Sequence, residues 1–179
     1  MNLAWGARVS PAFRGLVIGM CRRLVIEDPS WLLACMAFET GETFDPKIRN
    51  AAGSGAIGLI QFMPPTAAAL GTSTEQLAKM SPEEQLYMVE AHFKSWAGRL
   101  RSLGDVYGAI LWPGMIGKPD TAVIFDREDA KRPKLYLQNK GLDANKDGDI
   151  TKAEIVAKVQ AKLTRGLQPP NVFTMTAGV

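Results

Sequence analysis

Apolar residues recur along much of this chain at the three- and four-residue intervals of α-helices. Ser10, Asp28 and Ser81 each stand directly before a proline that is followed by apolar residues at helical spacing, which is typical of an N-cap followed by the first helical position. Helices are expected over residues 10–25, 29–39, 64–71 and 82–103, and the helix at 64–71 begins with proline and ends with glycine. The first nine residues are expected to form an arm. The pattern therefore predicts a mainly α chain.

The second half of the chain is less regular. A short helix capped by Asp105 is expected over 106–112, where Pro113 stops it. The apolar run 122–125 fits a short strand or a packed loop, and periodicity does not decide between them. Pro169 and Pro170 end the helical part and leave a tail. We expect a single helical domain, residues 1–179, with at most a small sheet.

Composition narrows the class of protein. With 179 residues, 46% of them hydrophobic, the chain can bury one sizeable core. A net charge of +3 is too mild for a dedicated nucleic-acid binder but suits an anionic cell wall. Cys21 and Cys35 lie in apolar helical runs, where buried thiols are expected. No run of 18 apolar residues and no signal peptide is recognised, so neither a transmembrane segment nor an export signal is expected.

Glu39 is the candidate for chemistry. It falls in the last turn of the helix predicted over 29–39, before Gly41, which suits a left-handed helix stop. The negative end of a helix and the apolar neighbours Met36 and Phe38 both disfavour its anionic form. A carboxyl group still protonated near neutral pH is what general acid cleavage of a glycosidic bond requires.

Two motifs resemble the soluble lytic transglycosylases, a bacteriophage-encoded type in particular. They are Glu39-Thr40-Gly41 and the segment 58–64, which reads GLIQFMP. The resemblance implies the lysozyme-like α+β fold and cleavage of the β-1,4 bond between N-acetylmuramic acid and N-acetylglucosamine in peptidoglycan. It further implies that Glu39 is the catalytic acid and base, that Thr40 supports it, and that the product carries a 1,6-anhydro ring. Gln61 and Phe62 are implied to contact the glycan strand.

Two tyrosines are further candidate substrate-binding residues. The third motif of that family, Ala-Tyr-Asn-Ala-Gly, would fall on 106–110, where only Tyr107 matches well and the asparagine is absent. Tyr107 is expected near Glu39, with a core aromatic as the equal alternative. The family often places a late tyrosine in the cleft, which implies Tyr136. The single histidine, His92, lies beside the apolar stripe of its helix, so no histidine-based triad is expected.

The segment 143–154 matches the twelve-residue EF-hand calcium loop. Its oxygen ligands would be Asp143, Asn145, Asp147, the Asp149 carbonyl, Thr151 and a bidentate Glu154. Gly148 is at the position of the sharp turn, and Ile150 is the usual apolar anchor. With one such loop and no partner loop, we expect a structural calcium ion and not a paired sensor.

Three functions remain open at this point. The first is a lytic transglycosylase, expected to be a monomer made in the host cytoplasm and acting on the periplasmic cell wall or carried on a virion. The second is a lysozyme-type hydrolase on the same fold, for which Glu42 and Asp45 are the nearest second carboxylates. Of these, Glu42 is expected to be exposed. The third is a non-catalytic, calcium-dependent wall-binding or virion structural protein.

Overall fold

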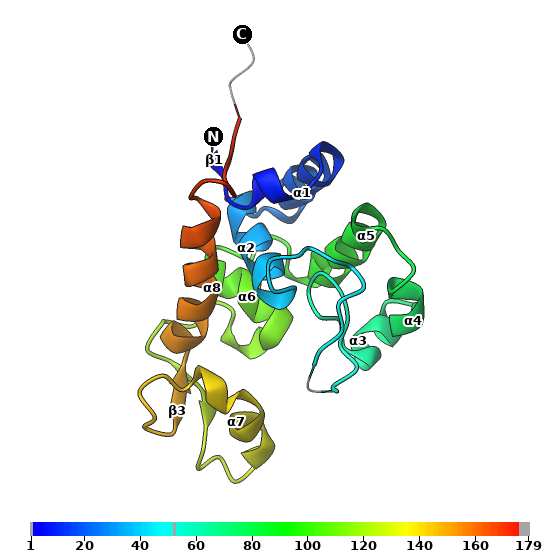
Figure 1. Cartoon of the computed structure of the whole chain (residues 1–179). Helices are drawn as coiled ribbons and strands as arrows, with labels where there is room; N and C mark the ends of the chain where they lie inside the picture. The colour runs from blue at the N-terminus through cyan, green and yellow to red at the C-terminus, as the bar shows by residue number, and fades with distance from the viewer. Residues whose placement is uncertain (1, 52, 176–179) are drawn as a thin grey trace.

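The computed structural model describes residues 2–51 and 53–175 (Figure 1). Within that part the α-helices are α1 (Pro11–Leu24), α2 (Pro29–Glu39), α3 (Pro64–Ala69), α4 (Thr74–Leu77), α5 (Pro82–Phe93), α6 (Leu103–Leu111), α7 (Pro133–Asn139) and α8 (Lys152–Gly166). Short 3-10 turns occur at Gly6–Arg8, Lys94–Trp96, Pro113–Met115 and Lys140–Leu142. The strands are β1 (Asn2–Leu3), β2 (Val123–Asp126), β3 (Asp149–Thr151) and β4 (Phe173–Thr174). The mainly helical class with small sheets is confirmed. No described helix is both long and apolar enough to span a bilayer.

Helix α2 is the centre of the molecule. It packs chiefly against α8, then α6 and α1, and Figure 1 shows it between these helices. Six consecutive residues, Leu32–Ala37, are buried on every side of the helix. A helix that is apolar all round belongs in a core, because any exposed face would leave apolar surface in water. Asp28 starts the helix by accepting the Ser30 N–H at 2.8 Å.

The predictions of an N-terminal arm and of a C-terminal tail are wrong. Both the first residues and the last described ones pack against the rest of the protein. Strand β1 pairs antiparallel with β4, with Leu3 opposite Phe173. Trp5 is 1% exposed, and its indole N–H donates to the Lys162 carbonyl at 2.9 Å. The arm and the tail are therefore both part of the fold. Residues 176–179 lie outside the described residues.

The prediction of one long helix over 82–103 is wrong. Helix α5 ends at Phe93, and the chain turns at Gly98, whose φ is +74°. The Gly98 N–H donates to the Leu24 carbonyl at 2.9 Å, which ties this turn to the end of α1. Helix α6 then begins at Leu103, where Ser102 is its N-cap in place of the predicted Asp105.

Asp105 has a different partner. Its carboxylate accepts from Lys152 Nζ at 2.8 Å and from the Gly117 N–H at 2.9 Å, and both charged side chains are buried. This ion pair fixes the start of α8 against α6. Before α8, strand β2 pairs antiparallel with β3, so the apolar run 122–125 contributes a strand.

Candidate functional site

A tight turn positions Glu39 at the end of α2. The Glu42 N–H donates to the Ala37 carbonyl at 2.7 Å, and Gly41 follows the helix with a φ of +58°. These are the features of a Schellman C-cap, in which a residue in the left-handed region reverses the chain. Glu39 is the last residue of the helix, so its carboxyl group lies by the negative end of the helix dipole.

Burial favours the protonated form of the Glu39 carboxyl group. Desolvation raises the pKa of Glu39 from 4.5 to about 7, and a hydrogen bond with Tyr107 lowers it in part. Burial and the neighbouring Glu39 carboxylate likewise raise the pKa of Tyr107 well above its ordinary value, so its hydroxyl stays a hydrogen-bond donor. The Tyr107 ring meets Phe38 edge-on, with centroids 5.6 Å apart, which fixes its orientation.

The prediction that Tyr107 lies beside Glu39 is therefore confirmed by their hydrogen bond. Tyr107 is also 3% exposed and part of the core, so the two alternatives for this residue hold together. Its hydroxyl is the polar end of a packed aromatic side chain. Helix α6 thus delivers one donor to the carboxyl group that α2 presents.

Thr40 acts on the backbone of the turn. It is fully buried, and its hydroxyl donates to the Met36 carbonyl at 2.7 Å and accepts from the Phe44 N–H at 3.0 Å. Phe44 has a φ of +54°, which is uncommon for a residue other than glycine. Thr40 thus supports the geometry around Glu39 and offers no surface to a substrate.

Gln61 lies in the loop that connects α2 to α3, drawn in cyan in Figure 1 beside the end of α2. Its φ is +52°, a strained conformation of the kind that clusters at functional sites. Its side-chain amide donates to the carbonyls of Ile48 and Gly58, both at 3.2 Å. These bonds lie within the loop, so they fix the Gln61 side chain against its own backbone.

Gln85 anchors this loop from α5, and the sequence reasoning missed it. Its carbonyl oxygen accepts from the Leu59 N–H at 2.7 Å, and its amide donates to the Pro46 carbonyl at 3.0 Å. Gly58, with a φ of +82°, packs so closely on Gln85 that a Cβ there would clash. The signal was present, because Gln85 is four residues before Val89 and so shares the apolar face of its helix.

Two predicted substrate contacts are placed elsewhere by the structure. Phe62 is 1% exposed and packs edge-on to His92, so it is a core residue with no face for a sugar. The Tyr136 hydroxyl donates to Asp143 Oδ2 at 2.7 Å, so this tyrosine contacts the predicted calcium loop. His92 accordingly has a packing role, and its ring nitrogen Nε2 lies 2.8 Å from the Ala109 carbonyl oxygen.

Glu42 is not the exposed residue that the sequence predicted. Its carboxylate lies 2.5 Å from Lys162 Nζ and 3.3 Å from the Arg165 guanidinium, and its side chain is 17% exposed. Both cations come from α8, which sequence spacing alone does not bring near. The charge of Glu42 is thus compensated, while Asp45 is exposed and accepts the Lys47 N–H at 2.8 Å.

The segment 143–154 has the turn geometry expected of a calcium loop. Asp143 accepts from the N–H groups of Lys146 and Gly148, and Gly148 has a φ of +99°. Glu154 accepts from the Ala144 N–H at 3.1 Å, which brings the twelfth position of the loop back to the second. Ile150 is fully buried and pairs with Phe125, as an apolar anchor should.

Negative charge accumulates beside this loop. Burial and then the carboxylates of Asp126 and Asp147 raise the pKa of Asp149. Among residues 2–51 and 53–175, however, no three acidic, histidine or cysteine side chains converge as a bound metal ion would require. The carboxylate oxygens of Asp143, Asp147 and Glu154 accept hydrogen bonds from backbone N–H groups of the loop instead. The order and type of the donors fit calcium, and the loop backbone has the required turn.

The two cysteines of the chain, Cys21 and Cys35, are buried free thiols, as predicted. Burial is the main cause that raises the pKa of Cys21 to about 12 and that of Cys35 well above its ordinary value, so neither is a reactive thiolate.

The candidate site therefore consists of Glu39 and Tyr107, with Thr40 and the Gln61 loop around them. Comparison with models of protein families, with curated proteins and with solved structures gave no match to this chain.

Proposed function

We propose that this protein is a peptidoglycan-cleaving lytic transglycosylase of the bacteriophage type, with Glu39 as its single acid and base. The observation that carries the proposal is the pKa of Glu39, raised to about 7 by burial at the end of a buried helix. A general acid works best when its pKa is near the working pH, because it is then protonated and still able to give up its proton. The motifs around Glu39 and Gln61 add the substrate class by resemblance.

In this mechanism the protonated Glu39 donates to the glycosidic oxygen as the bond from that oxygen to the muramic acid C1 breaks. The resulting carboxylate then accepts the proton of the sugar's own C6 hydroxyl, and the C6 oxygen bonds to C1. The product is a 1,6-anhydro ring, no water is consumed, and Glu39 ends protonated as it began. The Tyr107 hydroxyl holds the carboxyl group in place through both steps.

The structure favours this route over a lysozyme-type hydrolase. A hydrolase generally uses a second carboxylate to act as nucleophile or to activate water. Glu42 is paired with Lys162 and Arg165, and Asp45 is exposed and caps a turn. Neither is thus a free carboxylate beside Glu39, whereas a single acid and base is sufficient for the anhydro product.

Purified Glu39→Gln tests the proposal on isolated cell walls. Glutamine keeps the shape of the side chain and can accept the Tyr107 hydrogen bond, but it has no acid proton. We expect lysis to fall by roughly 10² to 10⁴, while the matched variant Glu42→Gln retains activity once corrected for its folded fraction. Near-normal lysis by folded Glu39→Gln would remove the catalytic role of this residue.

Mass analysis of the released fragments separates the remaining alternatives. The transglycosylase gives anhydro ends, each one water lighter than the reducing ends that a hydrolase gives. Hydrated ends as the main product would establish the hydrolase. Wall binding by the purified parent protein without any cleavage would establish a non-catalytic protein.

We also propose that the 143–154 loop holds a structural calcium ion. Asp143, Asn145, Asp147 and Glu154 would supply side-chain oxygens, together with the Asp149 carbonyl and Thr151. A bound ion would remove the repulsion among these carboxylates. Since β3 and the first residues of α8 lie within the loop, the effect of calcium is expected on stability and not on the chemistry at Glu39.

A further inference from the structure

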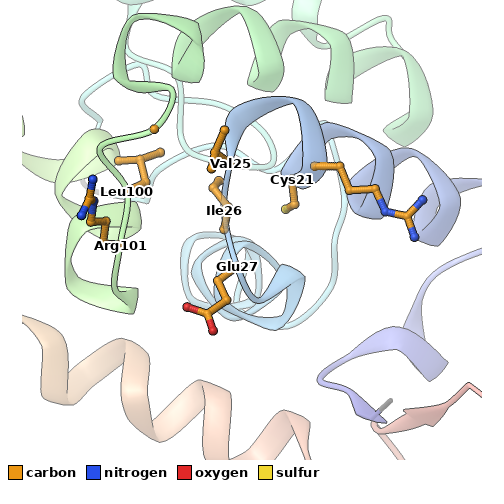
Figure 2. Close-up of a pocket in the computed structure, with 8 residues that line it drawn as sticks. Cys21, Val25, Ile26, Glu27, Leu100 and Arg101 are labelled. Atoms are coloured by element: carbon orange, nitrogen blue, oxygen red, sulfur yellow. The ribbon is translucent and has the colours of Figure 1, made fainter.

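Two apolar hollows flank the junction between the end of α1 and the 97–101 segment. One, of about 530 Å³, has Cys21, Ile26 and Leu100 in its walls, and Figure 2 shows these with Val25, Glu27 and Arg101. The other, of about 600 Å³, lies against Leu24, Tyr87 and Ala97. Gly98 lines the first hollow and Leu24 the second, and the hydrogen bond from the Gly98 N–H to the Leu24 carbonyl at 2.9 Å shows that the two hollows are neighbours.

Val25 at the middle of this surface is held in an unfavourable conformation. It has a φ of +58° and a ψ of +43° at the C-terminal stop of α1, where glycine is the usual residue. A β-branched residue in the left-handed region is an outlier. Its side chain is 67% exposed, so packing within the chain does not compensate for the strain. The hydrogen bond from the Ile26 N–H to the Cys21 carbonyl at 2.8 Å closes this helix stop, so the backbone conformation belongs to the end of α1. What the fold leaves without a partner is the exposed apolar side chain.

Basic residues surround these apolar groups. The surface, which we call the basic apolar face, carries Val25 and Tyr87 together with Arg22, Arg23, Lys94, Arg101, Glu27 and Glu90. Four basic and two acidic residues thus line the two hollows, which is a net charge of +2. The face is therefore both apolar and net basic.

Three of the four basic side chains of this face are available to a partner. The fourth, Arg23, is engaged by Glu90 at 2.6 Å. Among residues 2–51 and 53–175, the side chains of Arg22, Lys94 and Arg101 have no ion-pair partner.

We infer that the basic apolar face binds the surface of an anionic phospholipid membrane. A membrane surface offers phosphates to the arginines and, directly beneath them, an apolar layer for Val25 and Tyr87. Tyrosine is favoured at that depth because its ring is apolar and its hydroxyl polar. A soluble polyanion would match the cations but would leave the Val25 side chain in water, whereas a lipid surface accounts for both the cations and the exposed apolar side chains.

The face is remote from the candidate active site. Glu27 precedes α2 and Glu39 ends it, and an eleven-residue helix is roughly 16 Å long at 1.5 Å per residue. Membrane binding therefore leaves Glu39 free and does not depend on the function proposed for it.

Sedimentation of the full chain with vesicles tests this inference. We expect binding to phosphatidylcholine mixed with phosphatidylglycerol, weakened by salt, and no binding to phosphatidylcholine alone. Arg22→Glu with Arg101→Glu should lower the partition coefficient at least about 25-fold, because each basic group contributes about fivefold at an anionic surface. The matched control, Lys134→Glu with Lys158→Glu, makes the same charge change at exposed positions of α7 and α8 and should bind much more tightly than the first pair.

Val25→Gly separates the lipid contact from any structural role. Glycine relieves the strain at this φ, so the melting temperature should rise or stay constant while membrane binding falls about fivefold. If the double charge reversal does not fold, Arg22→Gln and Arg101→Gln measured singly should each lower binding about fivefold.

Four outcomes would overturn the inference. They are absence of vesicle binding, equal binding to both lipid compositions, an equal effect of the control pair, and unchanged binding by Val25→Gly. Retention on heparin that needs the arginines but not Val25, without vesicle binding, would assign the face to a soluble polyanion.

Discussion

Replacing Glu39 with glutamine should stabilise the protein at alkaline pH while it removes activity. The pKa of Glu39 is 4.5 in the unfolded chain and about 7 in the folded protein, because folding buries the carboxyl group. Below pH 4.5 the group is protonated in both states and burial costs little. As the pH rises through the folded pKa, ionisation favours the unfolded state, and the difference of two to three pKa units corresponds to about 3 kcal/mol. Glutamine is neutral throughout and avoids this penalty.

Chemical unfolding of the parent protein and Glu39→Gln, measured from pH 4.5 to pH 8.5, checks the magnitude. The variant should match the parent to within about 0.5 kcal/mol at the acid end and exceed it by about 3 kcal/mol above pH 8. For a chain of this length that is roughly 6–12 °C in melting temperature. Other carboxylates titrate equally in both proteins, so they cancel in the difference.

Glu42→Gln provides the opposite control. This substitution weakens the ion pairs with Lys162 and Arg165, so it should destabilise the protein at neutral pH. A difference between Glu39→Gln and the parent that does not change with pH would refute the desolvation of Glu39. So would a lower stability of that variant at pH 8.

Three further perturbations test other parts of the structure. Calcium at a hundredfold excess over its dissociation constant should stabilise the fold by roughly 2.7 kcal/mol, and Asp143→Ala with Glu154→Ala should abolish this; a melting curve indifferent to calcium would contradict the site. Lys152→Met should cost about 3–5 kcal/mol in urea unfolding at neutral pH, because Asp105 is left buried and unpaired. Burial raises the pKa of Asp105, but its hydrogen bonds, chiefly from Lys152, outweigh this and hold it below 3.8, so the loss should shrink as acid protonates Asp105; a loss that persists at low pH would count against the pair. Gln85→Leu should cost about 1–3 kcal/mol and speed hydrogen exchange of the loop amides it anchors, and unchanged exchange would show that the loop is held by other contacts.

Local chemistry made several helix boundaries predictable from the sequence. Ser10 and Ser81 accept the N–H groups of Phe13 and Glu84, three residues ahead in each case. Such bonds depend on neighbours in the sequence, so the pattern of residues is sufficient to place them. The position of Glu39 in the last turn of a buried helix was predictable for the same reason.

Contacts between distant segments were beyond that reasoning. The apolar stripe continues through Trp96 and Leu100 at helical spacing, yet the helix does not continue there. Gly98 has a positive φ, and its N–H donates to the Leu24 carbonyl. The partner of Glu42 is Lys162, 120 residues away. Neither propensity nor periodicity carries information about such pairs, because tertiary packing decides them.

The pairing of β1 with β4 makes the first part of the chain dependent on the last. Leu3 is fully buried, yet its strand partner Phe173 is among the last described residues to leave the ribosome. Until then the apolar side chains near the N-terminus have no finished core to enter and depend on the rest of the nascent chain. Contacts between residues so far apart in sequence also slow folding, because a long loop must close before they form. An early stop codon at the position of Phe173 would therefore act on the opposite end of the gene product, by exposing Leu3.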